Sequence, residues 1–141
     1  MPVVGELVVN EDKRATRFSH DNETGRPHYY CVRLDNGIRT EMAPTERGVH
    51  MRYSYPAEGG DAWLVLDGYT DMSSVHIHPG HRRVSGWVNN QRFVNDSRSF
   101  RCYFVAEFDT PFADWGLWEN RTDSIMPHST TGVGKGYGAY L

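Results

Sequence analysis

The stretch HYYCVRLDNGIRTEMAPT (residues 28–45) places two strand-like runs on either side of the tripeptide Asp35-Asn36-Gly37. Asn and Gly tolerate the positive φ angles of a tight turn, so we expect the chain to reverse direction there. The run from Ile38 to Thr45 alternates apolar and polar side chains and can pair back on His28 to Leu34. This stretch therefore predicts an antiparallel hairpin.

Strand signals recur along the rest of the chain, each ended by Gly, Pro, Asn or Asp, and helical periodicity is almost absent. The run from Phe100 to Phe108 is the clearest, because every second residue is apolar. The other expected strands are Val3 to Val9, Val49 to Tyr55, Ala62 to Leu66, Val75 to His78, Arg83 to Val88 and Gly116 to Glu119. About nine short strands with tight turns predict an all-β fold, an antiparallel β-sandwich.

The chain of 141 residues is long enough for one domain with a single core, so we expect a single sandwich over residues 1–141. Its tail from Thr130 to Leu141 is rich in glycine. We expect a sandwich that stops on this tail to leave a strand edge uncovered, and the domain to be incomplete.

The composition argues against two classes of partner. The net charge is −3, which gives no electrostatic reason to expect nucleic acid. No apolar run approaches the roughly 20 residues that a membrane helix needs.

Cys31 and Cys102 fit no metal spacing. Buried free thiols are the favoured interpretation, and the sequence leaves open whether the two cysteines form a disulfide.

His76 and His78 lie two apart on an expected strand, so both imidazoles point to one face, and His81 follows closely. Such a set can bind a metal ion, in a pattern similar to cupin barrels. However, Arg82 and Arg83 follow directly and would repel a cation. Histidines at the surface are therefore the favoured interpretation.

Two acidic residues also share an expected strand face, Glu107 and Asp109, at a separation of about 7 Å. Inverting glycosidases use a pair of carboxyls at about this distance, but the polar side of a half-exposed strand is the favoured interpretation. Trp115 and Trp118 present a similar choice between a platform on which a sugar stacks and packing in the core. Core packing is favoured.

Six blocks in a fixed order carry a family resemblance. They are RFSHDNE (17–23), YYCVRLDNGIRTE (29–41), TER (45–47), RRVSGWVNNQ (82–91), YFVAEFDTPF (103–112) and GYGAYL (136–141). Together they resemble the N-terminal β-sandwich domain of glycoside hydrolase family 92, the calcium-dependent exo-acting α-mannosidases. The resemblance covers the chain from about Thr16 to its end.

The resemblance implies a sandwich of the galactose-mutarotase-like supersandwich type, packed on a C-terminal (α/α)6 barrel of the same protein. It implies that the barrel holds the catalytic acids and the calcium ligands, and that the enzyme acts on mannosides or N-glycan-type glycans. We thus expect this chain to be a fragment of the N-terminal domain, without the barrel, without a cofactor and inactive alone. A periplasmic or extracellular location is implied for the parent protein only.

The expected role is to buttress the barrel and to frame the sugar cleft. The residues expected at the cleft or at the contact between domains are His20, Glu23 and Arg26, in a loop expected from His20 to Arg26, and Arg82 and Trp87. Two alternatives remain: an autonomous carbohydrate-binding sandwich that uses Trp115 and Trp118, and the weaker histidine metal site. The linkage that the parent enzyme cleaves and the oligomeric state stay open.

Overall fold

The computed structural model describes residues 1–68, 72–89 and 101–141. These residues form two compact units: an N-terminal unit, residues 2–63, and a C-terminal unit, residues 64–141 with Met1. In the described part of the chain, strands predominate and the strand pairs with a defined register are antiparallel, so the all-β fold class is confirmed. That residues 1–141 form a single domain stays a prediction. No helix in the described part of the chain is long and apolar enough to cross a membrane.

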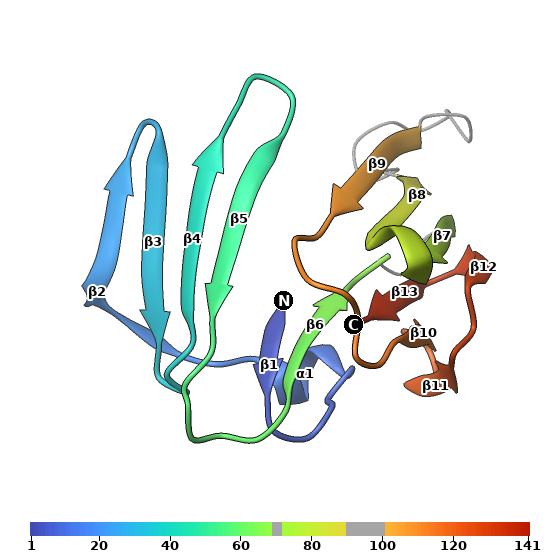
Figure 1. Ribbon diagram of the computed structural model, residues 1–141, viewed down its shortest axis with the longest axis horizontal. Helices are drawn as coiled ribbons and strands as arrows, with labels where there is room; N and C mark the ends of the chain where they lie inside the picture. Colours follow the sequence, from blue (N-terminus) through green and yellow to red (C-terminus); the bar gives the residue numbers. More distant parts are fainter. Residues whose placement is uncertain (69–71, 90–100) are drawn as a thin grey trace. The chain divides into compact units, whose positions relative to one another are not determined.

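The N-terminal unit is built on a sheet of four strands in chain order, which lie side by side in Figure 1. They are β2 (Phe18–Arg26), β3 (Tyr29–Leu34), β4 (Arg39–Pro44) and β5 (Val49–Ser54). The hairpin between β3 and β4 is confirmed. Gly37 has a φ of 87° and donates its N–H to the carbonyl of Leu34 at 2.9 Å, which closes the turn.

The two faces of this sheet differ because side chains alternate along each strand. Tyr30, Val32, Thr40, Met42 and Tyr53 are brought to one face by the register of β3 with β4 and of β4 with β5. Val32 and Thr40 are 6% and 5% exposed, so this face holds the buried side chains. The opposite face carries charged residues, among them Arg39, Glu41 and Arg52.

Two predictions near the N-terminus were wrong. The residues from His20 to Arg26, expected as a loop, belong to β2, whose register with β3 shifts between Phe18 and Glu23. Backbone pairing with β3 overrides the weak strand propensity of these polar residues. The strand expected over Val3 to Val9 is shorter, β1 (Pro2–Val4), because Gly5 turns the chain with a φ of 87°. A helical turn, α1 (Glu11–Arg14), follows and is capped by the side chain of Asn10.

The C-terminal unit is a sandwich of two sheets. One sheet has the order β6 (Ala62–Leu66), β13 (Tyr137–Tyr140), β10 (Gly116–Glu119) and β11 (Ser124–Pro127); the last three residues of β6 belong to this unit. The other has the order β12 (Thr131–Lys135), β7 (Met72–His78), β8 (Arg83–Asn89) and β9 (Arg101–Glu107), with a 3₁₀ turn, η1 (Pro79–His81), after β7. Phe100, where we expected β9 to begin, lies outside the described residues.

The core of this unit draws on both sheets. Val75, Ile77 and Val84 come from the β7–β8 side, while Leu117 and Ala139 come from β10 and β13. Each of these five side chains is at most 2% exposed. Burial of apolar side chains between two antiparallel sheets is the defining feature of a β-sandwich, which confirms that prediction for this unit.

The glycine-rich tail is part of this core rather than a loose end. It forms β12, which lies at the edge of its sheet beside β7, and β13, which lies between β6 and β10. A Cβ at Gly138 would lie 2.3 Å from Nε1 of Trp118 and 2.4 Å from the carbonyl oxygen of Leu66. Only glycine fits there, which is why the sequence looked unlike a strand.

Candidate functional site

A carboxylate with two polar partners lies where β2 meets β3. Glu23 accepts a hydrogen bond of 2.7 Å from the phenol of Tyr30, and its second oxygen is 2.5 Å from Nδ1 of His20. The hydrogen bond from Tyr30, and then the one from His20, hold the pKa of Glu23 below its usual range. Because the His20 side chain is 89% exposed, this cluster is open to a ligand.

The structure does not bring Arg26 to that cluster. Arg26 is paired with Tyr29, whereas Glu23 is paired with Val32, so the two side chains lie on opposite faces of the sheet. On the face of Arg26, Tyr29 donates a hydrogen bond of 2.6 Å to Glu41. This bond is the main cause that raises the pKa of Tyr29 to about 12.

Arg39 completes this second cluster. Its guanidinium is 3.2 Å from the Glu41 carboxylate, and its Nε donates to the sulfur of Cys31 at 3.3 Å. Both cysteines are free thiols; Cys31 is half-buried and Cys102 is exposed. The sequence analysis missed Tyr29, Tyr30 and Glu41 as partners, although the alternation along β3 and β4 already predicts which of them share a face.

Arg82 connects two segments of the C-terminal unit. It has a φ of 50° directly after η1, its N–H donates to the carbonyl of Pro79, and its guanidinium donates to the carbonyl of Asp109 at 2.7 Å. The Phe108 N–H in turn donates to the Arg82 carbonyl at 2.9 Å. These bonds hold the β7–β8 turn against the end of β9.

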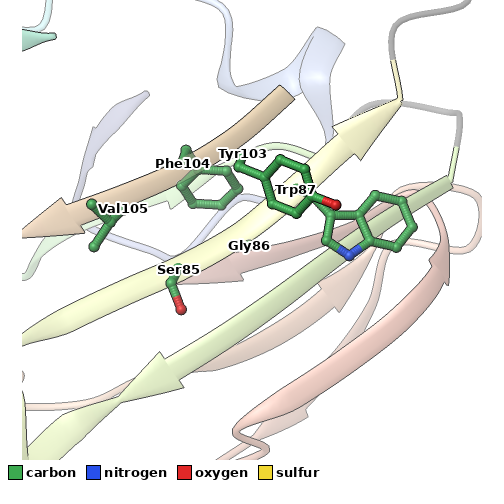
Figure 2. A pocket seen from close by; sticks show the side chains of 6 residues that line it. All are labelled: Ser85, Gly86, Trp87, Tyr103, Phe104 and Val105. Carbon is green, nitrogen blue, oxygen red and sulfur yellow. The ribbon is translucent and has the colours of Figure 1, made fainter. Parts of the chain in front are cut away.

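Trp87 lies on the outer side of β8, directly opposite Tyr103 of β9, and the two rings lie next to each other in Figure 2. Tyr103 is 71% exposed, and the guanidinium of Arg101 lies 3.9 Å from the centre of the Trp87 ring. The hollow here, of about 470 Å³, is lined by Ser85, Gly86, Trp87, Tyr103, Phe104 and Val105. Trp87 was expected from the sequence as a cleft or interdomain residue, which stays a prediction, whereas Tyr103 was not expected.

Trp115 and Trp118 do not form an exposed platform. Trp118 is fully buried, and its indole N–H donates to the carbonyl of Leu66 at 3.1 Å. Trp115 is half-buried and meets His128 edge-on, with 5.4 Å between the ring centres. Trp118 thus offers no ring face on which a sugar could stack in this structure.

His76 and His78 stack, with 4.1 Å between their ring centres, and Nε2 of His78 lies 3.0 Å from the hydroxyl of Ser85. Burial is the main cause that lowers the pKa of His78, followed by the positive charges of His76, Arg83 and His81. His81 lies in η1. Within the described ranges, no three His, Cys, Asp or Glu side chains gather as a metal site would require.

Comparison with known proteins gives three results. The model of the glycosyl hydrolase family 92 N-terminal domain matches residues 1–141. A solved structure of a family GH92 inverting mannosidase from Bacteroides thetaiotaomicron is similar to this chain with a TM-score of 0.88 and 32% identity, over 100% of this chain and 19% of that one. An uncharacterized secreted glycosidase of Arthroderma benhamiae is 21% identical over 97% of this chain.

The chain spans 19% of the length of each of these two relatives. The match to the solved mannosidase covers this chain from end to end, so it includes all of the described strands. The chain therefore belongs to the domain family defined by the N-terminal domain of glycosyl hydrolase family 92.

Proposed function

We propose that this chain is a non-catalytic part of the N-terminal sandwich of a glycosidase that removes terminal α-linked mannose. The observation that carries the proposal is the 32% identity and TM-score of 0.88 to an inverting mannosidase over the whole chain. Because this chain covers 19% of that mannosidase, we assign the catalytic acids to the remainder of the longer protein.

The distribution of carboxylates supports this assignment. An inverting glycosidase needs two carboxyls on either side of the scissile bond. In the described residues, the hollow beside Trp87 is lined without a carboxylate, and the hollow beside Tyr29 contains Glu41 alone. Neither hollow could therefore supply both an acid and a base.

For this part of the protein we propose the role of a buttress for an (α/α)6 catalytic barrel in the same polypeptide. The support is an exposed apolar surface on the outer side of the β12–β7–β8–β9 sheet. Met72, Tyr103, Val105 and Val133 are 38%, 71%, 62% and 58% exposed, and the strand register places Tyr103, Trp87 and Val133 in one row. Apolar surface of this kind marks a contact with another body.

His20, Glu23, Arg26, Arg82 and Trp87 remain our candidates for the sugar cleft or for the contact between domains. The exposed imidazole of His20 beside Glu23 supports a polar contact with a sugar hydroxyl. The exposed ring of Tyr103 beside Trp87 supports a contact with the barrel. Since the relative from Arthroderma is named as secreted, we also propose an extracellular or periplasmic location.

The described side chains of this chain do not provide the ligands that a calcium site needs. Ca²⁺ takes about six to eight oxygen ligands, whereas the described residues contain no cluster of three acidic, cysteine or histidine side chains. The stacked pair His76 and His78 offers nitrogen beside an arginine, which calcium does not prefer. We therefore propose that any calcium of the longer protein is held by residues outside this chain.

The test is an assay on an aryl α-mannoside, with and without calcium, for this chain alone and for a longer polypeptide that continues through the next domain. We expect turnover from the longer protein and none from the chain alone. Substantial turnover by the isolated chain would contradict the assignment of the acids to another domain. A longer protein that folds but hydrolyses no mannoside would contradict the proposed substrate.

The second candidate function is an autonomous carbohydrate-binding module. It is favoured by the exposed ring of Tyr103 beside Trp87 rather than by the tryptophans that the sequence suggested. Titration of mannose oligosaccharides, followed by tryptophan fluorescence, separates the two functions. Saturable binding that Tyr103→Ala abolishes would favour the module; no change in fluorescence would favour the buttress.

A further inference from the structure

One face of the sheet in the N-terminal unit carries a concentration of arginines. The strand register places Arg26 beside Tyr29, Arg33 opposite Arg39, and Arg52 opposite Glu41. We call this surface the basic face. Its members are Arg26, Arg33, Arg39, Arg52 and His50, with Thr24, Tyr29, Cys31, Glu41 and Ala43 between them.

The positive charge of the basic face is largely uncompensated. Arg26, Arg33 and Arg52 are exposed, and among the described residues none of them has a carboxylate within 4.0 Å. Arg39 alone has an acidic partner on this face, Glu41 at 3.2 Å. The chain as a whole carries a net charge of −3, so the basic face contrasts with the rest of the surface.

The arrangement is unfavourable for stability, which argues that it has another role. Arg33 and Arg39 are directly opposed on neighbouring strands. Like charges at opposed positions of an antiparallel pair destabilise the sheet. Neighbouring strands are about 4.8 Å apart. The guanidinium groups of Arg33 and Arg39 therefore repel each other, and an anion bound between them would relieve this repulsion.

A hollow on the same face adds groups that suit a sugar. It has a volume of about 150 Å³ and is lined by Tyr29, Glu41, Met42, Ala43, His50 and Arg52. The Glu41 carboxylate can accept hydrogen bonds from hydroxyl groups, and the ring of Tyr29 supplies an apolar side. Guanidinium groups bind sulfate, phosphate or carboxylate through two parallel hydrogen bonds.

We propose that the basic face binds an acidic glycan, with its anionic groups on Arg26, Arg33 and Arg52 and a hydroxyl on Glu41. The choice of a glycan rests on the proposed function in a glycosidase. Nucleic acid fits less well, because the phenol of Tyr29 is held by Glu41, so this face lacks the series of free aromatic rings on which bases stack.

The experiment measures binding of the 141-residue chain by isothermal titration calorimetry at low salt. The probes are dextran sulfate, polygalacturonate, neutral dextran, and a single-stranded oligonucleotide of similar charge. The variants are Arg33→Ala, Arg52→Ala and the double substitution, all at exposed sites. Arg47→Ala, in the turn between β4 and β5, removes the same charge away from the basic face and is the matched control.

We expect dextran sulfate or polygalacturonate to bind and neutral dextran not to bind; the stronger of the two identifies sulfate or carboxylate as the preferred group. Each single substitution should weaken binding by about two- to five-fold, as exposed charge pairs usually do, and salt should weaken it further. Equal losses in Arg47→Ala would overturn the proposal, because they indicate diffuse attraction. Binding of the oligonucleotide at equal strength, or no binding of either acidic glycan, would overturn it too.

The result of the titration does not depend on whether the longer protein hydrolyses a mannoside. A longer protein without mannosidase activity refutes the proposed function, whereas the titration refutes the binding surface alone. If the acidic glycan binds and the longer protein cleaves no mannoside, the basic face stands and the substrate class of the enzyme is revised.

Discussion

The phenol of Tyr30 and the carboxylate of Glu23 are joined across β2 and β3 by a hydrogen bond of 2.7 Å. The preceding residue, Tyr29, makes an equivalent bond of 2.6 Å to Glu41 on the opposite face of the sheet. One Tyr-Tyr pair thus holds two carboxylates, one on each face. Tyr30→Phe is therefore a variant for which Tyr29→Phe is the matched control.

In Tyr30→Phe, we expect the pKa of Glu23 to rise toward its ordinary value of 4.5, because the hydrogen bond that favours the charged form is lost. Tyr29→Phe should leave the pKa of Glu23 unchanged. A carbon-detected NMR titration of the Glu23 carboxyl measures both. An unchanged pKa in Tyr30→Phe would show that His20 alone causes the shift.

The same shift has a consequence for stability. Since the folded-state pKa of Glu23 is lowered, the ionised carboxylate stabilises the fold above pH 4.5, and this contribution is lost as the pH falls through the lowered value. Urea unfolding between pH 5 and acidic pH should therefore show a weaker pH dependence in Glu23→Gln than in the parent chain.

His78 should titrate below 6.5. Because its folded pKa is lowered, the neutral imidazole stabilises the fold above about pH 6.5, and stability is lost as the pH falls toward the folded value. Arg83→Gln should raise the pKa of His78, since it removes a neighbouring positive charge. Proton NMR of the imidazole gives both values, and a pKa of His78 above 6.5 would contradict this account.

Gly138→Ala should destabilise the chain by about 1–3 kcal/mol, the usual range for overpacking. The added methyl would lie 2.3 Å from Nε1 of Trp118, inside the core. Gly80→Ala is the control, because nothing lies within 4 Å of the added methyl there. We expect it to change the free energy of unfolding by less than about 0.5 kcal/mol in urea titrations. Similar values for the two variants would refute the interior position of β13.

Trp118→Ala should cost about 3–5 kcal/mol, since the side chain is fully buried and its indole donates to Leu66. Trp87→Ala should cost only about 1 kcal/mol, because its ring is half-exposed and its contact with Arg101 is a cation–π interaction at the surface. Thermal unfolding of both variants by circular dichroism tests this difference. A Trp118 variant as stable as the parent chain would place that residue outside the core.

Several parts of the fold could be predicted because they depend on neighbours in the sequence. The turn at Gly37 and the pairing of β3 with β4 follow from local conformational preference and alternation. The blocks of residues that resemble family 92 also led to the family, which the match over residues 1–141 confirms.

Other parts could not be predicted, because they depend on residues far apart in the chain. The strand β13 has a glycine at position 138 because Trp118 and Leu66 approach its backbone there, and no local pattern contains that information. For the same reason, the pairing of Trp87 with the exposed Tyr103 could not be predicted from the sequence. Tyr103 becomes a neighbour of Trp87 only when β9 pairs with β8.

The sequence by itself determined the all-β class, the hairpin at Gly37 and the family, because alternation and turn residues act over a few positions. Only the tertiary structure decided which carboxylates acquire partners, which tryptophan is buried and which arginines share a face. The physical reason is that strand register and sheet packing place on one face side chains such as Arg26 and Arg52 that are distant in the chain.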